Sequence, residues 1–200
     1  MKIDLHVHCR ERSLCSQVGE DEQISTAIRV GLDALVFTDH DRLAPPDKLD
    51  LLNLRYAPFQ VFGGIEVTLP EEHALVIGIQ DPQLESGLWN YPDLWNFVRR
   101  TGGFLGIAHP FRYNPEIKLD LESYPPDAIE LYSNNTPRSY EAQIRDLAAG
   151  LGIGLLSNSD AHQSSRLGAF YNLLDDEVES EAELVRVLKT TNRRIKLVAP

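Results

Sequence analysis

Short apolar runs alternate with amphipathic stretches along the chain, and the two patterns predict different elements. Apolar runs that end in polar residues are typical of buried parallel strands, whereas apolar residues three or four positions apart predict helices. The apolar runs predict strands over 4–8, 33–39, 59–69, 73–79, 104–108, 127–132, 153–157 and 194–198. Helical spacing predicts helices over 20–29, 47–55, 91–100, 138–149 and 180–190.

Repeated strand–helix units indicate an α/β fold, in which helices cover a parallel sheet that is open or closed into a barrel. A Pro-Glu-Glu turn between 59–69 and 73–79 indicates a hairpin at that point. The 200 residues contain no internal repeat or linker-like stretch, so we expect a single domain over 1–200. With no apolar run of membrane-spanning length and no signal-peptide pattern, we expect a soluble cytoplasmic protein.

All six histidines fall at the ends of predicted strands. His6 and His8 alternate along the first strand, so their rings point to the same face. His73 alone begins a strand, and the hairpin would fold it back beside Glu66. For any single histidine, a cap, a core hydrogen bond or plain exposure is an adequate explanation. Because functional residues of α/β folds collect at the carboxyl ends of strands, one shared rim explains all six better.

This rim would offer imidazole and carboxylate groups, which are ligands for zinc, iron and manganese. The candidate metal ligands are His6, His8, His40, Glu66, His73, His109, Asp160 and His162. They are too many for one four-coordinate ion, so we expect two or three divalent ions, with Glu66 or Asp160 able to bridge two. Such a site lowers the pKa of bound water from about 15.7 toward 7, and the resulting metal-bound hydroxide, with Asp160 and Glu66, would be the catalytic group.

Charge narrows the choice of substrate. A net charge of −11 argues against the broad basic surface that extended nucleic acid requires. A small phosphorylated compound remains compatible, because bound metal ions invert the local field.

Cys9 and Cys15 lie close together near the first strand, and we expect both to be reduced thiols. The acidic run at 175–183 is interpreted as a solvated turn and helix start.

Five motifs, in this order along the chain, resemble the PHP (polymerase and histidinol phosphatase) family of metal-dependent phosphoesterases. They are Asp4-Leu5-His6-Val7-His8, Thr38-Asp39-His40-Asp41, Gly64-Ile65-Glu66, Ala108-His109-Pro110 and Ser159-Asp160-Ala161-His162. The resemblance covers residues 4 to about 170. It implies a distorted seven-stranded β/α, TIM-like barrel, with a trinuclear centre of zinc, manganese or iron at the C-terminal ends of the strands.

The resemblance also assigns ligands by position. His6, His8, Glu66 and Asp160 would hold the first ion. Glu66, His73 and His109 would hold the second, and His40 and His162 the third. Asp39 and Asp41 flank His40, and we expect them to orient its imidazole from behind rather than to bind metal.

One stretch departs from the family pattern. Members usually supply a further Asp or His to the third ion several residues after the opening motif, but Ser13-Leu14-Cys15-Ser16 stands there. Cys15 is the best substitute, because thiolates bind zinc and iron well, and Glu11 is the second choice. The alternative is a buried, inert Cys15 with a weak or empty third site, which would leave a binuclear enzyme.

Arginines in loops near the rim are candidates for holding a phosphate through forked hydrogen bonds. Arg10, Arg12 and Arg166 are the first choices, and later loops add Arg112 and Arg138. Asn134 and Asn135 follow a predicted strand and either contact substrate or form a turn. Glu130 lies inside that strand and either reaches the rim or pairs with a basic neighbour.

These residues together predict a metal-dependent phosphoesterase that hydrolyses a small phosphorylated substrate, either a phosphomonoester or a nucleotide. Histidinol-phosphate phosphatase and 5′ nuclease or nucleotide phosphatase are alternatives within the enzyme class. A non-catalytic, metal-stabilised binding module is the alternative of another class. We expect neither extended nucleic acid nor a membrane as a partner, and the oligomeric state stays open.

Overall fold

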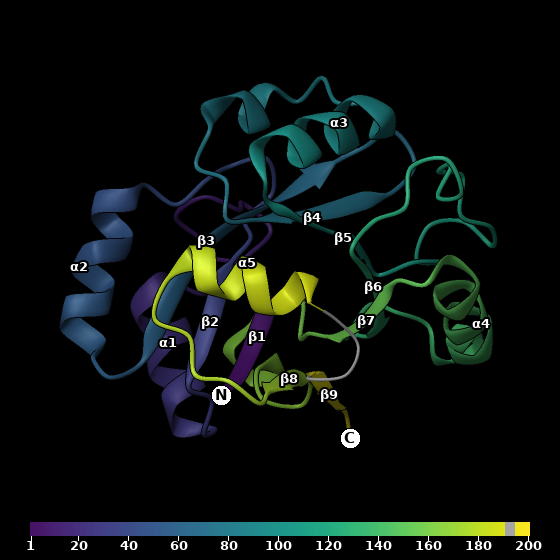
Figure 1. Cartoon of the computed structure of the whole chain (residues 1–200). Helices are drawn as coiled ribbons and strands as arrows, with labels where there is room; N and C mark the ends of the chain where they lie inside the picture. The colour runs from purple at the N-terminus through teal and green to yellow at the C-terminus, as the bar shows by residue number, and fades with distance from the viewer. Residues whose placement is uncertain (191–194) are drawn as a thin grey trace.

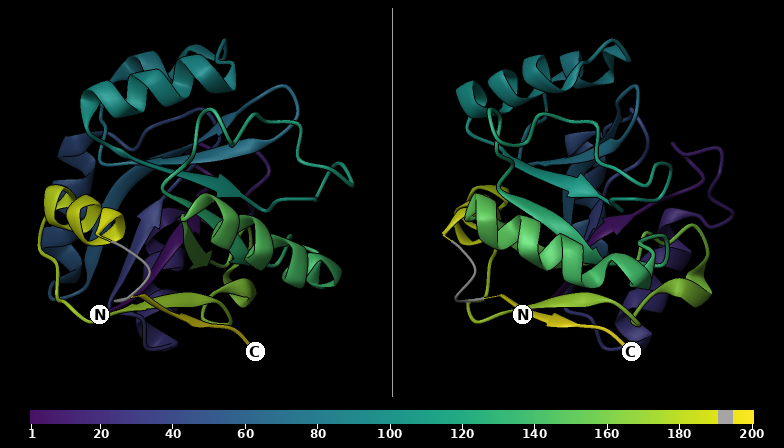
Figure 2. Two further views of the ribbon diagram at one scale, coloured as in Figure 1. Left: turned by 45° about the vertical axis from the view of Figure 1, so that its right-hand side comes forward. Right: turned by 90° about the vertical axis from the view of Figure 1, so that its right-hand side faces the viewer.

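A curved β-sheet forms the centre of the computed structural model, which describes residues 1–190 and 195–200. Its strands are β1 (Lys2–Val7), β2 (Ala34–Phe37), β3 (Gln60–Thr68), β4 (His73–Ile77), β5 (Phe104–Ala108), β6 (Ala128–Tyr132), β7 (Gly154–Ser157), β8 (Tyr171–Leu174) and β9 (Ile195–Val198). They are ordered β7-β6-β5-β4-β3-β2-β1-β8-β9. The sheet curls into a nearly closed barrel, which Figure 2 shows from two sides.

Helices surround this sheet, with α2 on the left, α3 at the top and α4 on the right of Figure 1. The helices are α1 (Glu20–Arg29), α2 (Pro46–Tyr56), α3 (Tyr91–Thr101), α4 (Glu141–Leu151) and α5 (Glu181–Lys189). Short 3-10 turns are η1 (Pro82–Ser86), η2 (Arg138–Tyr140) and η3 (Ser164–Arg166). None of the described helices is long and apolar enough to cross a membrane.

Local chemistry explains where α3 begins and ends. The side chain of Asn90 accepts a hydrogen bond from the backbone N–H of Asp93, which satisfies one of the free donors of the first turn. Gly102 closes the helix with φ of 85°, a left-handed conformation that glycine adopts without a steric penalty. Four apolar residues of α3 are buried on one face, namely Tyr91, Leu94, Phe97 and Val98.

The predicted hairpin is confirmed, and it matters for the site. Strands β3 and β4 pair antiparallel with Thr68 opposite His73, and β4 pairs antiparallel with β5 so that His73 faces Ala108. The remaining core pairs, β1–β2, β2–β3, β5–β6 and β6–β7, are parallel. The hairpin therefore turns the start of β4 toward the rim at which the parallel strands end.

The predicted α/β class is confirmed, but the described residues form nine strands, not the seven-stranded TIM-like barrel that the resemblance implied. Strand β8 was not predicted, and it forms through antiparallel pairing with β1 and β9. The helix predicted over 138–149 starts at Glu141, after η2. Arg194, the first residue of the last predicted strand, lies outside the described residues.

Buried side chains close the barrel where β7 and β1 do not pair as neighbouring strands. Asn172 donates through Nδ2 to Ser157 O and to Asn158 Oδ1, both at 2.8 Å, and its Oδ1 accepts from Ser157 N at 3.0 Å. Asn158 Oδ1 also accepts from Leu5 N at 3.2 Å. Polar side chains thus replace the missing ladder hydrogen bonds between these strands.

We expect Asn172→Ala to lower the free energy of unfolding by about 2–4 kcal/mol, because it leaves several buried backbone and side-chain groups without partners. Urea unfolding followed by circular dichroism measures this change. The matched control is Asn96→Ala on the exposed face of α3, for which about 0.5 kcal/mol or less is expected. Equal stability of the two variants would contradict the closing role of Asn172.

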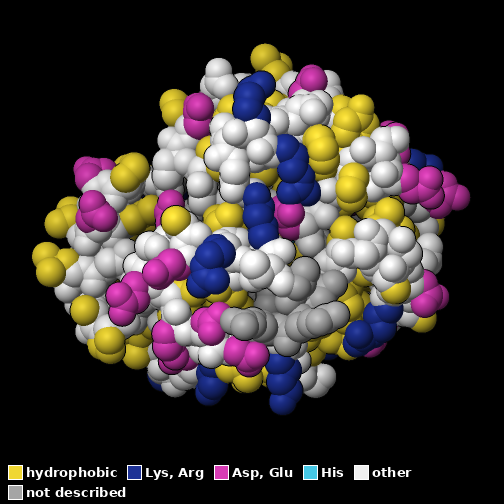
Figure 3. All heavy atoms as spheres, in the orientation of Figure 1, with side chains coloured by type: hydrophobic (Ala, Val, Ile, Leu, Met, Phe, Trp, Pro, Cys, Tyr) yellow, Lys and Arg dark blue, Asp and Glu magenta, His cyan; other side chains and the backbone are white. Residues whose placement is uncertain are grey.

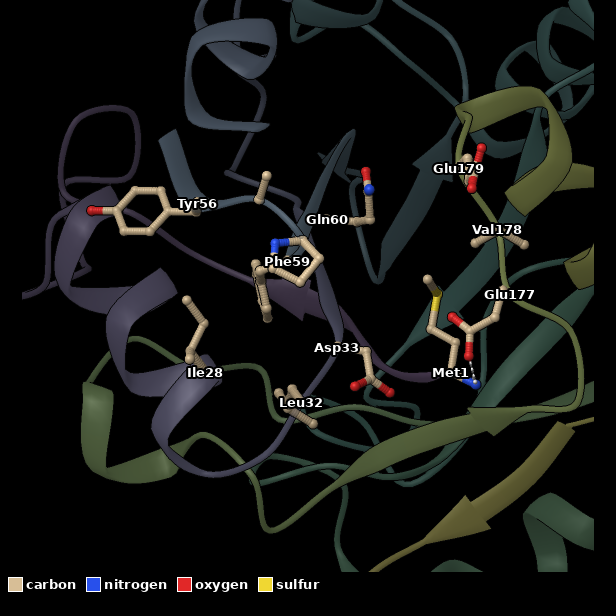
Figure 4. Close-up of a pocket in the computed structure, with 12 residues that line it drawn as sticks. Met1, Ile28, Leu32, Asp33, Tyr56, Phe59, Gln60, Glu177, Val178 and Glu179 are labelled. Carbon is tan, nitrogen blue, oxygen red and sulfur yellow. Dashed lines mark ion pairs between the residues drawn. The ribbon is translucent and has the colours of Figure 1, made fainter. Parts of the chain in front are cut away.

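A hollow of about 600 Å³ lies at the amino ends of β1, β2 and β3. Figure 4 shows Leu32 and Phe59 toward one side of this hollow, Met1 and Glu177 toward the other, and Asp33 between them. None of the six histidines lines this hollow, so it is separate from the residues predicted to bind metal. The face of the molecule in Figure 3 likewise shows no histidine, and its basic and acidic side chains are interspersed.

Candidate metal centre

The opening motif brings two imidazoles to the carboxyl end of β1. His6 and His8 are fully buried and their ring centroids lie 5.0 Å apart. The backbone of His8 donates to Ala161 O at 3.1 Å, which draws the segment after β7 against the end of β1. A bridge between His40 and Glu66 likewise joins the ends of β2 and β3.

Glu66 lies at the middle of the rim and is fully buried. Its Oε2 atom is 3.2 Å from His6 Nε2, 3.1 Å from His8 Nε2 and 3.0 Å from His40 Nδ1. Its Oε1 atom is 2.8 Å from both His73 Nδ1 and His109 Nε2. One carboxylate therefore touches five imidazoles that come from four different strand ends.

Asp160 is the second buried carboxylate. Its Oδ1 atom lies 3.4 Å from His6 Nε2, 3.2 Å from His8 Nε2 and 3.4 Å from His162 Nδ1. Its Oδ2 atom accepts hydrogen bonds from Asn135 Nδ2 at 2.5 Å and Arg112 at 3.4 Å. One oxygen is thus held by protein donors while the other points toward the histidines.

Three sets of ligand atoms each lie within 4.8 Å of one another among the described residues. They are His6 with His8, Glu66 and Asp160; His40 with Glu66 and His73; and His8 with His40 and His162. The first set has the membership that the resemblance assigned to the first ion. The other two sets differ from the ligands that the resemblance assigned. In the second set His40 stands with Glu66 and His73, whereas His109 contacts Glu66 but belongs to no set.

These residues fit a cation. Five buried atoms of the rim have no hydrogen-bond partner among the described residues: His6 Nε2, His8 Nε2, Glu66 Oε2, His109 Nδ1 and Asp160 Oδ1. Leaving such groups buried and unpaired costs free energy, which coordination of a divalent ion would remove. The donor set of imidazoles and carboxylates is also the set that zinc, iron and manganese bind.

The protonation states of the carboxylates and of His162 suit a cation. Burial opposes a charge on His8, but Asp160 and Glu66 raise its pKa to about 9, so a bound ion would have to displace a proton there. Burial alone raises the pKa of Glu66 and of Asp160, but the charge on His6 and hydrogen bonds from the surrounding imidazoles hold both well below their usual values. Burial and the charge on His8 lower the pKa of His162 to about 4. Ionised carboxylates and a neutral His162 imidazole are the forms that coordinate metal.

Backbone strain is concentrated at this rim. Asp41, His109 and Asp160 have φ values of 51°, 26° and 50°, in the left-handed region that side chains other than glycine seldom adopt. Conformations of this kind cost about 1–3 kcal/mol each and are typical of functional sites. The fold therefore holds these residues in place at the expense of stability.

Glu130 contacts two histidines of the rim, which is one of the two expectations for this residue, although it was not counted among the metal ligands or their supports. Its Oε1 lies 2.9 Å from His6 Nδ1 and accepts from Asn158 Nδ2 at 2.7 Å, while its Oε2 accepts from His109 N at 2.7 Å. The contact fixes which ring nitrogen of His6 faces the rim. An acidic residue inside the apolar strand β6 was the available signal.

Asp39 acts on the rim through a serine. Ser13 Oγ donates to Asp39 Oδ1 at 2.6 Å, lies 3.3 Å from His8 Nδ1 and accepts from His40 N at 3.1 Å. Asp39 therefore orients the His8 ring through Ser13. The same Ser13 hydroxyl links Asp39 to the backbone N–H of His40. Asp41 Oδ1 instead accepts from Thr68 N at 2.8 Å, which ties the end of β3 to the loop after β2.

The candidate phosphate-binding arginines lie in different surroundings. Arg12 donates to Asp39 Oδ2 at 2.7 Å and pairs with Glu20, so its charge is already compensated inside the protein. Arg10 is exposed. Arg166 lines a pocket beside the metal ligands, together with Arg112.

The structure also shows where the two candidate extra ligands of the third ion, Cys15 and Glu11, lie. Cys15 is exposed and lines the same pocket as His162, but it belongs to none of the three ligand sets among the described residues. Glu11 accepts from the backbone N–H of Glu20 at 3.2 Å, at the start of α1. Cys9, in contrast, is buried in the core.

We expect Glu130→Gln to weaken metal binding by about 10- to 100-fold, the usual effect of removing a carboxylate that orients a ligating histidine. Competition for Zn²⁺ against a chelating dye measures this affinity. Glu116→Gln changes an exposed carboxylate and should leave the affinity as it is. Unchanged affinity in Glu130→Gln would mean that His6 does not depend on this contact.

Comparison with known proteins adds independent support. Residues 140–192 match the family of PHP-associated sequences. No curated protein matches the chain.

Several solved structures share the fold. PsfC from Pseudomonas syringae has 20% identity and a TM-score of 0.71, with 100% of this chain and 91% of PsfC covered. A two-domain protein from Bacteroides vulgatus, which contains a predicted PHP-like metal-dependent phosphoesterase, has 17% identity and a TM-score of 0.72; 100% of this chain and 64% of that protein are covered. An amidohydrolase from Chromobacterium violaceum, solved with sulfate and without metal, has 18% identity and a TM-score of 0.61. The match covers 81% of this chain and 88% of that protein.

These structural likenesses establish the fold alone, because all the identities are low. The PHP-associated match covers the segment from η2 to just beyond α5. The five motifs, whose histidines and carboxylates meet at one rim, lie mostly before that segment. The chain is therefore similar in sequence to PHP-associated proteins over residues 140–192, and it shares its fold with a solved protein that contains a predicted PHP-like domain.

Proposed function

We propose that the protein is a metal-dependent hydrolase that acts on phosphoric esters, with a small phosphorylated compound as its substrate. The observation that carries this proposal is the rim itself, where the Glu66 carboxylate belongs to two of three overlapping ligand sets. Shared ligands favour neighbouring ions, which is the arrangement that phosphoryl-transfer sites use.

Divalent ions held at this rim would supply an activated water molecule and would polarise the phosphoryl oxygens. The chain's own residues have separate tasks. Glu66 and Asp160 would hold the ions, and Asn135 donates a hydrogen bond to Asp160 Oδ2, which leaves Oδ1 facing the histidines. Arg112 lies beside Asp160 and borders the adjoining pocket, where it orients a phosphate at the rim.

The names of the similar proteins support hydrolysis and leave two reaction classes. The Bacteroides protein contains a predicted metal-dependent phosphoesterase, which favours phosphoric esters. The Chromobacterium protein is named an amidohydrolase, which makes C–N bond hydrolysis the second candidate. We favour the ester, because two arginine side chains border the pocket beside the metal ligands.

The test is release of orthophosphate from p-nitrophenyl phosphate by protein loaded with Mn²⁺, Zn²⁺ or Fe²⁺. Bis-p-nitrophenyl phosphate separates monoesterase from diesterase activity, and p-nitroacetanilide tests amide hydrolysis. Metal-dependent turnover of the monoester supports the proposal. Turnover of the anilide alone would assign the amidohydrolase reaction, and binding of metal without turnover of any of the three would favour a non-catalytic module.

A further inference from the structure

A small pocket adjoins the metal ligands on one side. Its volume is about 270 Å³, below the roughly 300–1,000 Å³ of pockets for drug-sized ligands. Asp160 and His162 form its inner wall. The rest is lined by Cys15, Arg112, Asn134, Asn135, Gln163 and Arg166. A substrate whose phosphate lies at the rim would therefore place its alcohol part in this pocket.

Two of the three side-chain amides that line the pocket already donate hydrogen bonds to residues of the rim. Asn134 Nδ2 donates to Ser159 O, and Asn135 Nδ2 donates to Asp160 Oδ2. The amide of Gln163 makes no side-chain hydrogen bond among the described residues and is free to bind a ligand. Among the described residues, no Phe, Tyr or Trp lines the pocket, and its one ring, the His162 imidazole, belongs to a metal-ligand set. A planar base would therefore find little stacking surface there.

Arg166 is one of several arginines that form no ion pair among the described residues, and it lines the pocket beside the metal ligands. Arg12 and Arg145, in contrast, pair with carboxylates at their own sites, and Arg112 already lies 3.4 Å from Asp160. Within residues 1–190 and 195–200, no carboxylate forms an ion pair with Arg166, although the chain carries an excess of 11 negative charges. An exposed, uncompensated guanidinium on a pocket wall is suited to an anionic oxygen group, which its planar fork binds with two hydrogen bonds.

We propose that the alcohol part of the substrate is a short aliphatic chain carrying a second anionic group, a carboxylate or another phosphate, which Arg166 binds. This inference rests on the proposed phosphoesterase function. In the reaction, a bond forms between water oxygen and phosphorus, and the bond from phosphorus to the ester oxygen breaks. The water proton passes to the leaving alcohol, which keeps its second anionic group, and orthophosphate is released.

Three esters of one three-carbon chain test the proposal. They are 3-hydroxypropyl phosphate, 3-phosphonooxypropanoate and propane-1,3-diyl bisphosphate, which end in a hydroxyl, a carboxylate and a second phosphate. We expect kcat/KM to be about 10- to 100-fold higher for at least one anionic ester than for the hydroxyl ester, mainly through KM, as charge-assisted hydrogen bonds predict. The preferred anionic ester identifies the second group.

Arg166→Gln should bring the ratio of kcat/KM between anionic and hydroxyl esters close to one, and Arg166→Lys should keep part of it, because lysine retains the charge without the fork. Arg186→Gln on the exposed side of α5 is the matched control and should keep the wild-type ratio. Thermal melting of each variant checks that it is folded.

The outcomes separate this inference from the function on which it rests. Equal turnover of the three esters, or a preference for adenosine 5′-monophosphate over all of them, would overturn the inference and leave the phosphoesterase function in place. A preference that survives in Arg166→Gln would overturn the role of that residue. No hydrolysis of these esters or of p-nitrophenyl phosphate would overturn both.

Discussion

Glu66→Gln should lower kcat/KM for a phosphomonoester by about 1,000-fold or more in protein supplied with excess metal. The Oε1 and Oε2 atoms of Glu66 together contact five imidazoles, and the residue belongs to two of the three ligand sets. The amide lacks the negative charge and one acceptor oxygen. Metal ions contribute several kcal/mol to such reactions, and each tenfold change in rate corresponds to about 1.4 kcal/mol.

Metal content, measured by mass spectrometry after gel filtration, accompanies the kinetic assay and should fall in Glu66→Gln. The matched control is Glu71→Gln, in the exposed turn between β3 and β4, which should keep both metal and activity. If Glu66→Gln retained its full metal content and lost less than tenfold in kcat/KM, Glu66 would not be the shared ligand that the geometry indicates.

Removing metal should lower the melting temperature by about 10 °C. The rim buries two carboxylates among six imidazoles, and several of their atoms have no protein partner. A ligand present at a thousand times its dissociation constant adds about 4 kcal/mol of stability if it binds only the folded state. In a chain of this length, each kcal/mol shifts the melting temperature by about 2–4 °C.

Differential scanning fluorimetry with EDTA-treated protein, with and without added Zn²⁺ or Mn²⁺, measures the shift. The same titration in Glu66→Gln provides the control, because most of the increase should be lost there. A melting temperature that does not change with metal in the wild-type protein would show that the rim does not bind these ions tightly in the folded state.

Most of the fold could be predicted because its signals are local. The apolar run of β5 matched the strand in the structure at both ends, and the spacing in 20–29 matched α1. Gly102 and the turn before His73 marked a helix end and a hairpin for backbone reasons that depend on a few neighbouring residues. Strand β8 was missed because its formation depends on pairing with β1, which is far away in the sequence.

The metal ligands of the candidate site could be predicted from one rule, that the carboxyl ends of the parallel strands meet at one rim. That rule brought Glu66 and the histidines together without any distance being known. It left the role of Glu130 open and said nothing of Ser13, because a side chain that supports a ligand from behind is defined only by what it touches. It also offered Arg12 as a phosphate ligand, whereas Arg12 is paired with Asp39 and Glu20.

The sequence by itself determined which chemical groups stand at the end of each strand, because strand periodicity and turn residues act over a few positions. The tertiary structure alone decided how those groups divide into ligand sets, which arginines pair with carboxylates, and how Asn172 closes the barrel between β7 and β1. Those outcomes depend on distances of a few ångströms between residues far apart in the chain. Only the packing of the whole sheet sets such distances.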